Sequence, residues 1–160
     1  MPLAWLPKLV LLKDSDNDWN RYLESIYGIF RADFIEQKIT FDGRRVGLKR
    51  HPIESGKEST FWHFISDGET EADREINLRR CERIGWPRAI IDNCNDGCLK
   101  TWSEYRGTEL RIHIWCETAE YLLVLADRRE YVLPWTAYPV YQRHAQKKLL
   151  TRWKNATEKS

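Results

Sequence analysis

The sequence predicts an α+β fold, in which N-terminal helices pack on a C-terminal antiparallel β-meander that ends in a helix. Residues 19–34 repeat apolar side chains at the i, i+3, i+4 spacing of an amphipathic helix. Residues 110–138 instead contain short stretches with the character of strands. The links between these stretches, 117–118 and 127–129, are short and charged, which favours antiparallel pairing of neighbouring strands.

The first helix is expected directly after the cluster Asp14–Asp18, because Asp and Asn side chains accept hydrogen bonds from the free N–H groups of a helix start. The side chains expected to pack on the sheet are Trp19, Tyr22, Leu23, Ile26, Tyr27, Phe30 and Phe34. Residues 1–17 form an N-terminal extension that packs against the body or frays. Pro2 and Pro7 break its apolar run, and it lacks the charged start and cleavage site of a signal peptide.

A hairpin and short helices are predicted between the first helix and the sheet. Residues 39–49 hold an Asp-Gly pair between short β-like runs, which is a strong hairpin signal. Ser59 or Thr60 is expected to cap a short helix that ends at Gly68. A second helical stretch over residues 76–84 follows an acidic loop.

The remaining elements complete one predicted domain, residues 18–155. Pro87 suits the first turn of a further helix over residues 87–93. Residues 99–105 fit a strand as well as a helix. A C-terminal helix over residues 141–154 is expected after the meander, with residues 156–160 as a tail.

The meander is expected to have two unlike faces. In the strand over residues 110–116 the two faces alternate: Leu110, Ile112, Ile114 and Cys116 on one, and Arg111, His113 and Trp115 on the other. Residues 121–126 are nearly all apolar, which is typical of a central strand covered on both sides. Residues 131–138 close the set and end in a polar-aromatic cluster. Any chemistry is therefore expected on the polar face.

The composition is that of a folded globular domain, and the absence of an export signal predicts a cytoplasmic location. The chain has 160 residues, of which 42% are hydrophobic and 31% charged, and its net charge is +2. No apolar run is long enough to cross a bilayer, so no membrane partner is expected. The four cysteines, expected to be reduced thiols, are Cys81, Cys94, Cys98 and Cys116. Cys94 and Cys98 do not have a common zinc spacing and lack a second pair, so neither a metal nor another cofactor is predicted.

Catalytic candidates must be found one by one, because no P-loop, GxGxxG, GxSxG or HExxH motif is present. His63 lies between aromatic residues and is either a packed core residue or a titratable group in a dry pocket. A neutral imidazole can take up a proton without a metal, which suits a general base. His51 precedes Pro52 in a loop and is a base or a surface histidine, and His113 on the polar face is a third candidate.

Two further groups suit the binding of a phosphate. Arg80 and Arg83 flank Glu82 on one predicted helix, which is either a surface salt-bridge pattern or a guanidinium clamp. Thr136 and Tyr138 lie two residues apart, so their side chains share a strand face and can both donate to phosphate oxygens. Strand propensity alone also accounts for this pair.

A basic segment follows the meander and suits RNA. Residues 143–160 contain six Lys or Arg side chains and one acidic side chain. Such a segment either attracts phosphate through counterion release or forms a solvated helix face. The candidate RNA-binding residues are Lys49, Trp62, Trp135, Arg143 and Lys147.

Two segments resemble a known family. The first is KRHPIESGKESTFWHFISDG followed by RRCERIGWPRAII, and the second is LLVLADRREYVLPWTAYPV, in which TAYP is the most specific piece. The second resembles the end of the barnase–EndoU–colicin–RelE (BECR) nuclease superfamily, notably of its phage-associated branch. The resemblance covers roughly residues 18–150 and implies helices followed by a four-stranded antiparallel meander.

The resemblance implies a metal-independent endoribonuclease of toxin or phage-related type. In such enzymes the 2′-hydroxyl of RNA attacks the adjacent phosphate and leaves a 2′,3′-cyclic phosphate. The site residues that it implies are Thr136 and Tyr138 as strand hydroxyls, His63 or His51 as the histidine, and Arg80 or Arg83 as the cation. RNA is the implied partner, with an antitoxin or immunity protein as a further partner. Pro134 departs from the pattern, because it removes an N–H donor inside the last strand and predicts an edge strand or a bulge there.

An alternative function is a non-catalytic RNA- or protein-binding module. It would use the polar face of the sheet and the basic C-terminal helix, with Trp62, Trp135 and Trp153 as stacking platforms. This alternative predicts salt-dependent binding without strand cleavage.

Overall fold

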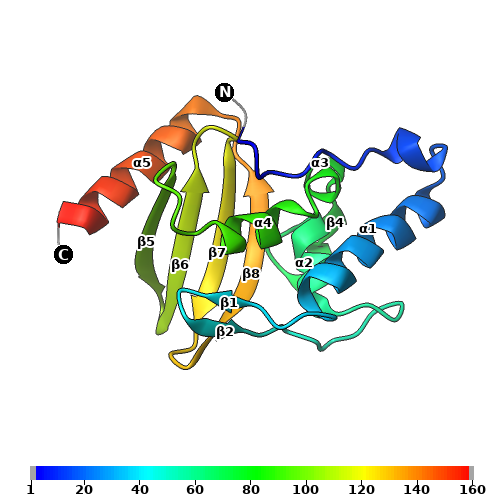
Figure 1. The fold of residues 1–160 in the computed structure, drawn as a ribbon, viewed down its shortest axis with the longest axis horizontal. Helices are drawn as coiled ribbons and strands as arrows, with labels where there is room; N and C mark the ends of the chain where they lie inside the picture. The colour runs from blue at the N-terminus through cyan, green and yellow to red at the C-terminus, as the bar shows by residue number, and fades with distance from the viewer. Residues whose placement is uncertain (1–2, 159–160) are drawn as a thin grey trace.

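A six-stranded sheet forms the centre of the fold, and helices cover parts of both of its faces (Figure 1). The computed structural model describes residues 3–158 and confirms the predicted α+β fold. The helices are α1 (Trp19–Phe34), α2 (Ser59–Ile65), α3 (Leu78–Glu82), α4 (Trp86–Asp92) and α5 (Arg143–Glu158), with 3₁₀ turns η1 (Leu12–Ser15) and η2 (Glu71–Asp73). The strands are β1 (Thr40–Phe41), β2 (Arg44–Val46), β3 (Ser66–Asp67), β4 (Glu75–Ile76), β5 (Leu99–Arg106), β6 (Glu109–Cys116), β7 (Tyr121–Asp127) and β8 (Tyr131–Pro139). Residues 1–2 of the predicted extension and residues 159–160 of the predicted tail lie outside the described residues.

The strand order of the large sheet is β1-β2-β8-β7-β6-β5. Strands β5 to β8 form an antiparallel meander, so the segment that fitted either a strand or a helix is a strand. The predicted hairpin is also confirmed: β1 and β2 pair across Asp42 and Gly43, which both have positive φ angles, as a tight turn requires. Strand β2 then pairs in parallel with the start of β8, through Arg45 with Tyr131 and Val46 with Val132.

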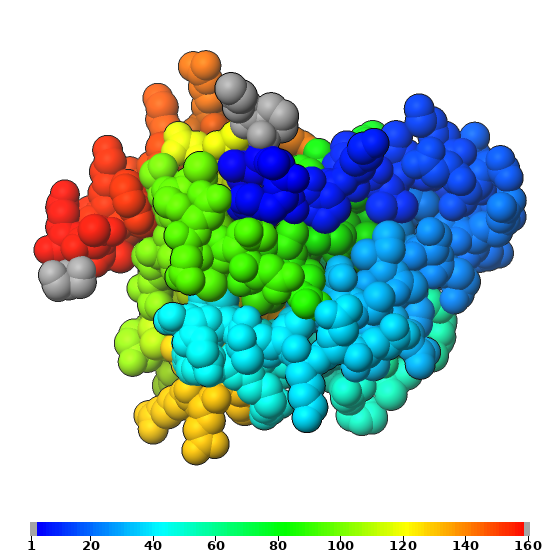
Figure 2. Space-filling view, viewed as in Figure 1, coloured from blue at the N-terminus to red at the C-terminus, as the bar shows by residue number. Residues whose placement is uncertain are grey.

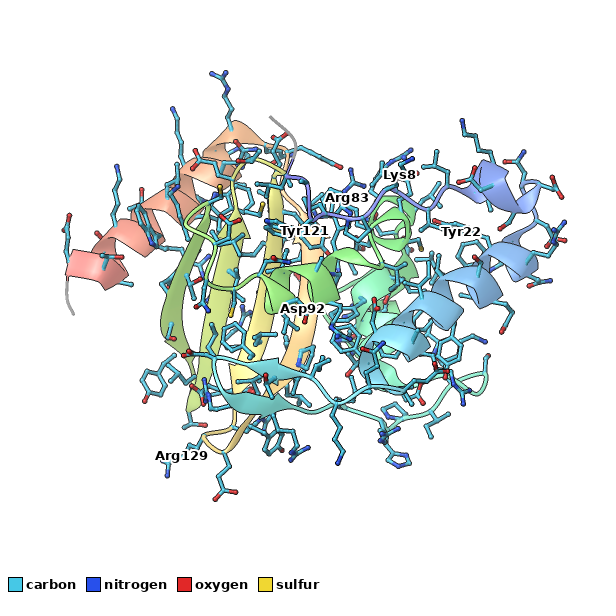
Figure 3. The ribbon with its side chains drawn as sticks, viewed as in Figure 1. Lys8, Tyr22, Arg83, Asp92, Tyr121 and Arg129 are labelled. Atoms are coloured by element: carbon cyan, nitrogen blue, oxygen red, sulfur yellow. The ribbon has the colours of Figure 1, made fainter. Side chains whose placement is uncertain are left out.

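The N-terminal segment packs against the helices. Figure 2 shows it lying over the residues around α4. Tyr22 of α1, labelled in Figure 3, donates a hydrogen bond to the carbonyl of Val10 at 2.6 Å. Trp86 of α4 donates to the carbonyl of Pro7 at 2.9 Å. Of the two predicted alternatives for this segment, packing and fraying, residues 3–17 therefore pack against the body of the protein.

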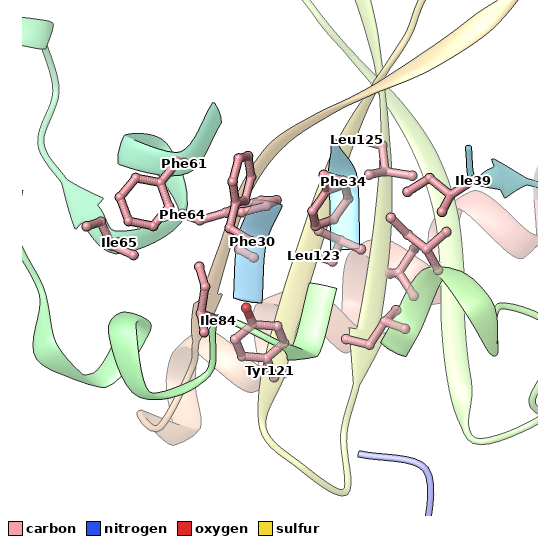
Figure 4. Close-up of a cluster of buried hydrophobic side chains, with 14 of the residues drawn as sticks. Phe30, Phe34, Ile39, Phe61, Phe64, Ile65, Ile84, Tyr121, Leu123 and Leu125 are labelled. Carbon is pink, nitrogen blue, oxygen red and sulfur yellow. The ribbon is translucent and has the colours of Figure 1, made fainter. Parts of the chain in front are cut away.

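Aromatic side chains join α1 and α2 to the sheet (Figure 4). Asp18 caps α1 by accepting hydrogen bonds from the N–H groups of Asn20 and Arg21, as the sequence predicted. The ring of Phe30, which is fully buried, lies 5.4 Å from that of Phe61 and 6.0 Å from that of Phe64, measured between centroids. Since both partners belong to α2, this contact fixes α2 between α1 and the sheet.

The opposite face of the sheet is partly covered by α5. Leu149 and Trp153 of α5 pack with Trp102, Trp115 and other side chains of that face. The prediction of a polar face is therefore wrong at Trp115, which is fully buried, because the C-terminal helix packs there instead of remaining in solvent. This helix runs from Arg143 to Glu158, whereas the predicted range was 141–154.

The region before the meander differs most from the prediction. Neither Ser59 nor Thr60 caps α2: the N-cap position is Glu58, and the Thr60 hydroxyl bonds instead to the backbone N–H and carbonyl of Lys49. The chain after α2 forms the small β3–β4 hairpin. Because this hairpin includes Ile76, the following helix α3 is shorter than the predicted stretch over 76–84.

Asp33 provides a test of stability against pH. Burial raises the pKa of this carboxyl to about 6, although Arg88 acts in the opposite direction. Its pKa is higher than in an unfolded chain, so ionisation of Asp33 destabilises the folded state above about pH 6, and the cost disappears as the pH falls towards 4. Because the carboxyl is only partly buried, we expect Asp33→Asn to stabilise the protein by about 1 kcal/mol at pH 7.5.

The measurement is thermal unfolding of wild type and Asp33→Asn at pH 7.5 and pH 4.5, with Glu130→Gln at an exposed carboxylate as the matched control. The gain should shrink at the lower pH. An equal gain at both pH values would show that ionisation of Asp33 is not its cause.

Candidate active site

Two adjoining hollows form a groove on the sheet face that α5 leaves open. The first, called here the His63 hollow, has a volume of about 740 Å³. The second, the Arg152 hollow, has a volume of about 480 Å³. The His63 hollow is lined by His63, Asp67, Gly68, Glu69, Thr70, Glu71, Arg74, Arg80, Arg106, Arg111, Trp135, Thr136 and Tyr138. The Arg152 hollow is lined by Glu104, Tyr105, Arg106, Arg111, His113, Val124, Thr136, Tyr138 and Arg152.

The pairing register of the sheet places the groove side chains on one face. Val124 of β7 pairs with Thr136 of β8 on one side and with His113 of β6 on the other, so these three side chains share a face. Leu122 likewise pairs with Tyr138. The groove floor is therefore built from β6, β7 and β8, and of these the sequence predicted two-faced alternation for β6.

The pairing of β7 with β8 contains a register shift beside the groove. It lies between Val124 and Leu125 of β7, and Leu125 pairs with Pro134, so Trp135 is the extra residue on β8. This confirms the irregularity predicted from Pro134. Consecutive residues of a regular strand point to opposite faces. Because of the bulge, Trp135 and Thr136 both line the His63 hollow.

Arg80 joins the elements of the His63 hollow. Its Nη1 donates to the carbonyl of Ser66 at 2.5 Å, to the carbonyl of His63 at 3.3 Å and to Oγ1 of Thr136 at 3.3 Å. Its guanidinium carbon also lies 4.9 Å from the centre of the Tyr138 ring. Burial lowers the pKa of Arg80, but an arginine remains charged at neutral pH. A fixed positive charge therefore lies beside the hydroxyl of Thr136 and the ring of Tyr138.

His63 is buried and paired with a carboxylate. Its Nε2 lies 2.7 Å from Oε1 of Glu71, and its ring centroid is 6.0 Å from that of Trp135. Burial and the charge of Arg74 lower the pKa of His63 below its ordinary value, against the opposing effect of Glu71. For Glu71, partial burial acts to raise the pKa, but the hydrogen bond with His63 and the charge of Arg74 lower it. His63 is therefore neutral at pH 7 and able to accept a proton.

Glu71 reaches His63 because the loop between β3 and β4 folds back over the site. Gly68 opens this loop with a φ of +153°, and a Cβ atom there would lie 2.8 Å from the carbonyl oxygen of Asp73 and from Cα of Arg74. Only glycine fits at this position. Arg74 closes the loop by donating from Nε to the hydroxyl of Ser66 at 2.9 Å.

Two cations lie over the ring of Trp135. The guanidinium carbon of Arg111 is 4.3 Å from the centroid of the Trp135 ring, and Nζ of Lys49 is 5.6 Å from it. Arg111 is also held by Glu109, whose Oε2 accepts from Nη2 at 3.1 Å. Lys49 and Trp135, both predicted to bind RNA, therefore lie together at the edge of the His63 hollow.

Two of the predicted catalytic residues lie elsewhere. His51 is exposed in the loop before α2 and lines neither hollow. Arg83, labelled in Figure 3, lies just beyond the end of α3 at Glu82, so it leaves the helical face that carries Arg80. Its guanidinium carbon lies 5.1 Å from the ring of Trp86. Of the two histidines and the two arginines, His63 and Arg80 line the groove, whereas His51 and Arg83 do not.

Three of the predicted RNA-binding residues also lie outside the groove. Trp62 donates from Nε1 to the carbonyl of Glu54 at 3.0 Å and lines a neighbouring hollow. Arg143 and Lys147 are exposed on the first half of α5, whereas Arg152, further along the same helix, reaches the groove. The basic helix therefore contributes Arg152 to the groove, and not the predicted Arg143 and Lys147.

Several groove residues were not singled out from the sequence. They are Glu71, Arg74, Glu104, Arg106, Arg111 and Arg152. Arg111 could have been found, because it lies two residues before His113 and so shares the polar face of the strand with it. Glu71 and Arg74 gave no such signal, since an acidic loop is usually solvated and only the β3–β4 hairpin turns it towards His63.

Within residues 3–158, no group of three or more His, Cys, Asp or Glu side chains is arranged so that it could hold a metal ion. All four cysteines are free thiols. No helix of the described chain has the length and apolar character needed to span a membrane. No family model matches the sequence, and no curated protein or solved structure is significantly similar to it.

Proposed function

We propose that this protein is a metal-independent endoribonuclease of toxin or phage-related type, as the resemblance to the BECR superfamily implies. One observation carries the proposal. His63, Arg80, Thr136 and Tyr138, which come from three separate elements, line a single hollow. The arrangement supplies a neutral imidazole, a fixed cation and two hydroxyls around a space that accepts a phosphate.

In the proposed reaction a phosphodiester of RNA lies between Arg80 and the hydroxyls of Thr136 and Tyr138. His63 takes the proton from the 2′-hydroxyl, and the 2′-oxygen attacks phosphorus. The P–O5′ bond breaks, O5′ takes a proton from solvent, and a 2′,3′-cyclic phosphate remains. Arg80 and the two hydroxyls stabilise the charge that grows on the non-bridging oxygens. Glu71 holds the ring of His63 in place through the bond to Nε2.

Removal of the Tyr138 hydroxyl tests this proposal. Tyr138→Phe keeps the ring under Arg80 but loses one hydrogen bond to a charged phosphoryl group, worth roughly 1.5–3 kcal/mol. We therefore expect kcat/KM to fall about 10- to 100-fold with an unchanged melting temperature. The assay uses purified protein with an RNA oligonucleotide in the presence of EDTA, and mass spectrometry identifies the 2′,3′-cyclic ends.

The matched control is Tyr141→Phe, at an exposed tyrosine outside the groove, which should cleave like wild type. A 2′-deoxy oligonucleotide should not be cleaved, since it lacks the nucleophile. Cleavage of this DNA, or loss of activity in EDTA, would contradict the proposed mechanism. Salt-dependent RNA binding without any cleavage would favour the non-catalytic binding module instead.

Further partners follow from this proposal. A cytoplasmic ribonuclease of the toxin class would need an antitoxin or immunity protein that covers the groove, and co-expression with a candidate partner that relieves growth arrest would identify one.

A further inference from the structure

We propose that the Arg152 hollow is a second anion subsite, which binds another phosphodiester of the same single-stranded RNA as that strand leaves the His63 hollow. The inference rests on the proposed function, because it takes the RNA strand as the ligand of the first hollow. It adds a binding site and a direction: the strand crosses the sheet from β8 towards β5.

The two hollows are continuous. Both are lined by Thr136 and Tyr138 of β8, by Arg111 of β6 and by Arg106 of β5. Strands β8 and β5 are separated by β7 and β6, a distance of roughly 14 Å across the sheet. The volume of the second hollow lies in the range of sites that hold small ligands. A strand bound at Thr136 therefore has an open path to Arg106.

The middle of the path between the two hollows is floored by a small side chain. Val124 lies on β7 between Thr136 and His113, and it is a small apolar side chain between two polar ones. Helix α5 packs on the neighbouring part of this face through Leu149 and Trp153, and its Arg152 lines the hollow. The end of the sheet face near Arg106 therefore remains accessible.

The Arg152 hollow also carries an excess of positive charge. Its lining contains three arginines and one carboxylate, that of Glu104. Arg152 is paired with Glu104, and its Nη2 lies 3.2 Å from Nε2 of His113. Because the guanidinium is the donor in this contact, His113 accepts and is neutral, and burial together with Arg152 lowers its pKa to about 4. His113 thus adds no charge at neutral pH.

Two of the guanidinium groups are available to an anion. Arg106 is exposed and has no side-chain hydrogen bond or ion pair within residues 3–158. Arg111 is bonded to Glu109 through Nη2, but its Nε is buried and has no hydrogen-bond partner there. A buried donor without a partner is costly. A phosphate between Arg106 and Arg111 would balance the charge of both guanidinium groups.

Arg106→Ala is the variant that tests the subsite, because Arg106 is exposed and makes no internal contact that the fold depends on. The probe is a fluorescent 2′-O-methyl hexanucleotide, which cannot be cleaved, so binding is measured independently of catalysis. Fluorescence anisotropy over a range of salt concentrations gives both the affinity and the salt slope. The matched control is Arg143→Ala, which removes the same charge from the exposed start of α5.

We expect Arg106→Ala to weaken binding of the hexanucleotide about fivefold or more at 0.1 M salt and to reduce the salt slope by about 0.7, the value for one phosphate of a single strand. Arg143→Ala should change the affinity less than twofold. Equal affinities for Arg106→Ala and Arg143→Ala, or no binding of the probe to the wild type, would overturn the subsite. RNA cleavage by wild type together with equal affinities of these variants would leave the ribonuclease proposal standing and reject the subsite alone.

Discussion

Replacement of His63 by alanine is expected to lower kcat/KM for RNA by about 10²- to 10⁴-fold, which is the usual contribution of a positioned general base. His63 is the histidine whose ring lies in the same hollow as Arg80, Thr136 and Tyr138. Without it, the 2′-hydroxyl would have to lose its proton to water. The measurement is the initial rate of RNA cleavage below saturation, with each variant first checked by thermal unfolding.

The pH dependence of the cleavage rate distinguishes a general base at His63 from a general acid. A base must be neutral to act, and the pKa of His63 lies below the ordinary 6.5 because of burial and the charge of Arg74. The rate should therefore be level around pH 7 and fall only as the pH drops through that lowered pKa. If His63 were the general acid, the rate would instead rise as the pH falls through that lowered pKa.

Two further variants test whether Glu71 tunes the pKa of His63 or only contributes to packing. Glu71 raises the pKa of His63, so Glu71→Gln should move the acidic fall of the rate to still lower pH while the protein stays folded. His144→Ala, at an exposed histidine of α5, is the matched control and should behave like wild type. An active His63→Ala variant that unfolds at the wild-type temperature would remove His63 from the mechanism.

The parts of the fold that could be predicted are those fixed by local sequence. The apolar stripe of residues 19–34 and the Asp42-Gly43 turn each depend on neighbours within a few residues, and both are confirmed. The alternation on β6 likewise placed Arg111 and His113 on the groove face. It could not show that Trp115 on this face is buried, because that depends on where α5 packs.

The site was predictable only in part, for a similar reason. Thr136 and Tyr138 share a strand face by simple alternation, so their meeting needed no tertiary information. The choice of Arg80 over Arg83 depended on where α3 ends, and helix ends are poorly fixed by sequence. The pairing of Glu71 with His63 depends on the return of the β3–β4 loop, which no pattern in the acidic segment indicates.

Phe30→Ala is expected to destabilise the protein by about 3–5 kcal/mol, the usual loss for a buried aromatic ring in a core. Phe30 is fully buried, and the centroid of its ring lies 5.4 Å from those of Phe34 and Phe61. The cavity left by the ring would lie between α1 and α2. For a chain of this length we expect a fall in melting temperature of roughly 10 °C or more, measured by thermal unfolding.

The same substitution links the core to the groove. Phe61 and His63 belong to the same short helix, so loosening the contact of α2 with α1 should also disturb the placement of His63. We therefore expect Phe30→Ala to lose RNA cleavage at temperatures where most of the protein is still folded. Ile53→Ala, at an exposed isoleucine of the preceding loop, is the control and should change the stability by less than about 0.5 kcal/mol. A Phe30→Ala variant that melts like this control would mean that α2 is held in place by its contacts with β8 rather than by the aromatic cluster.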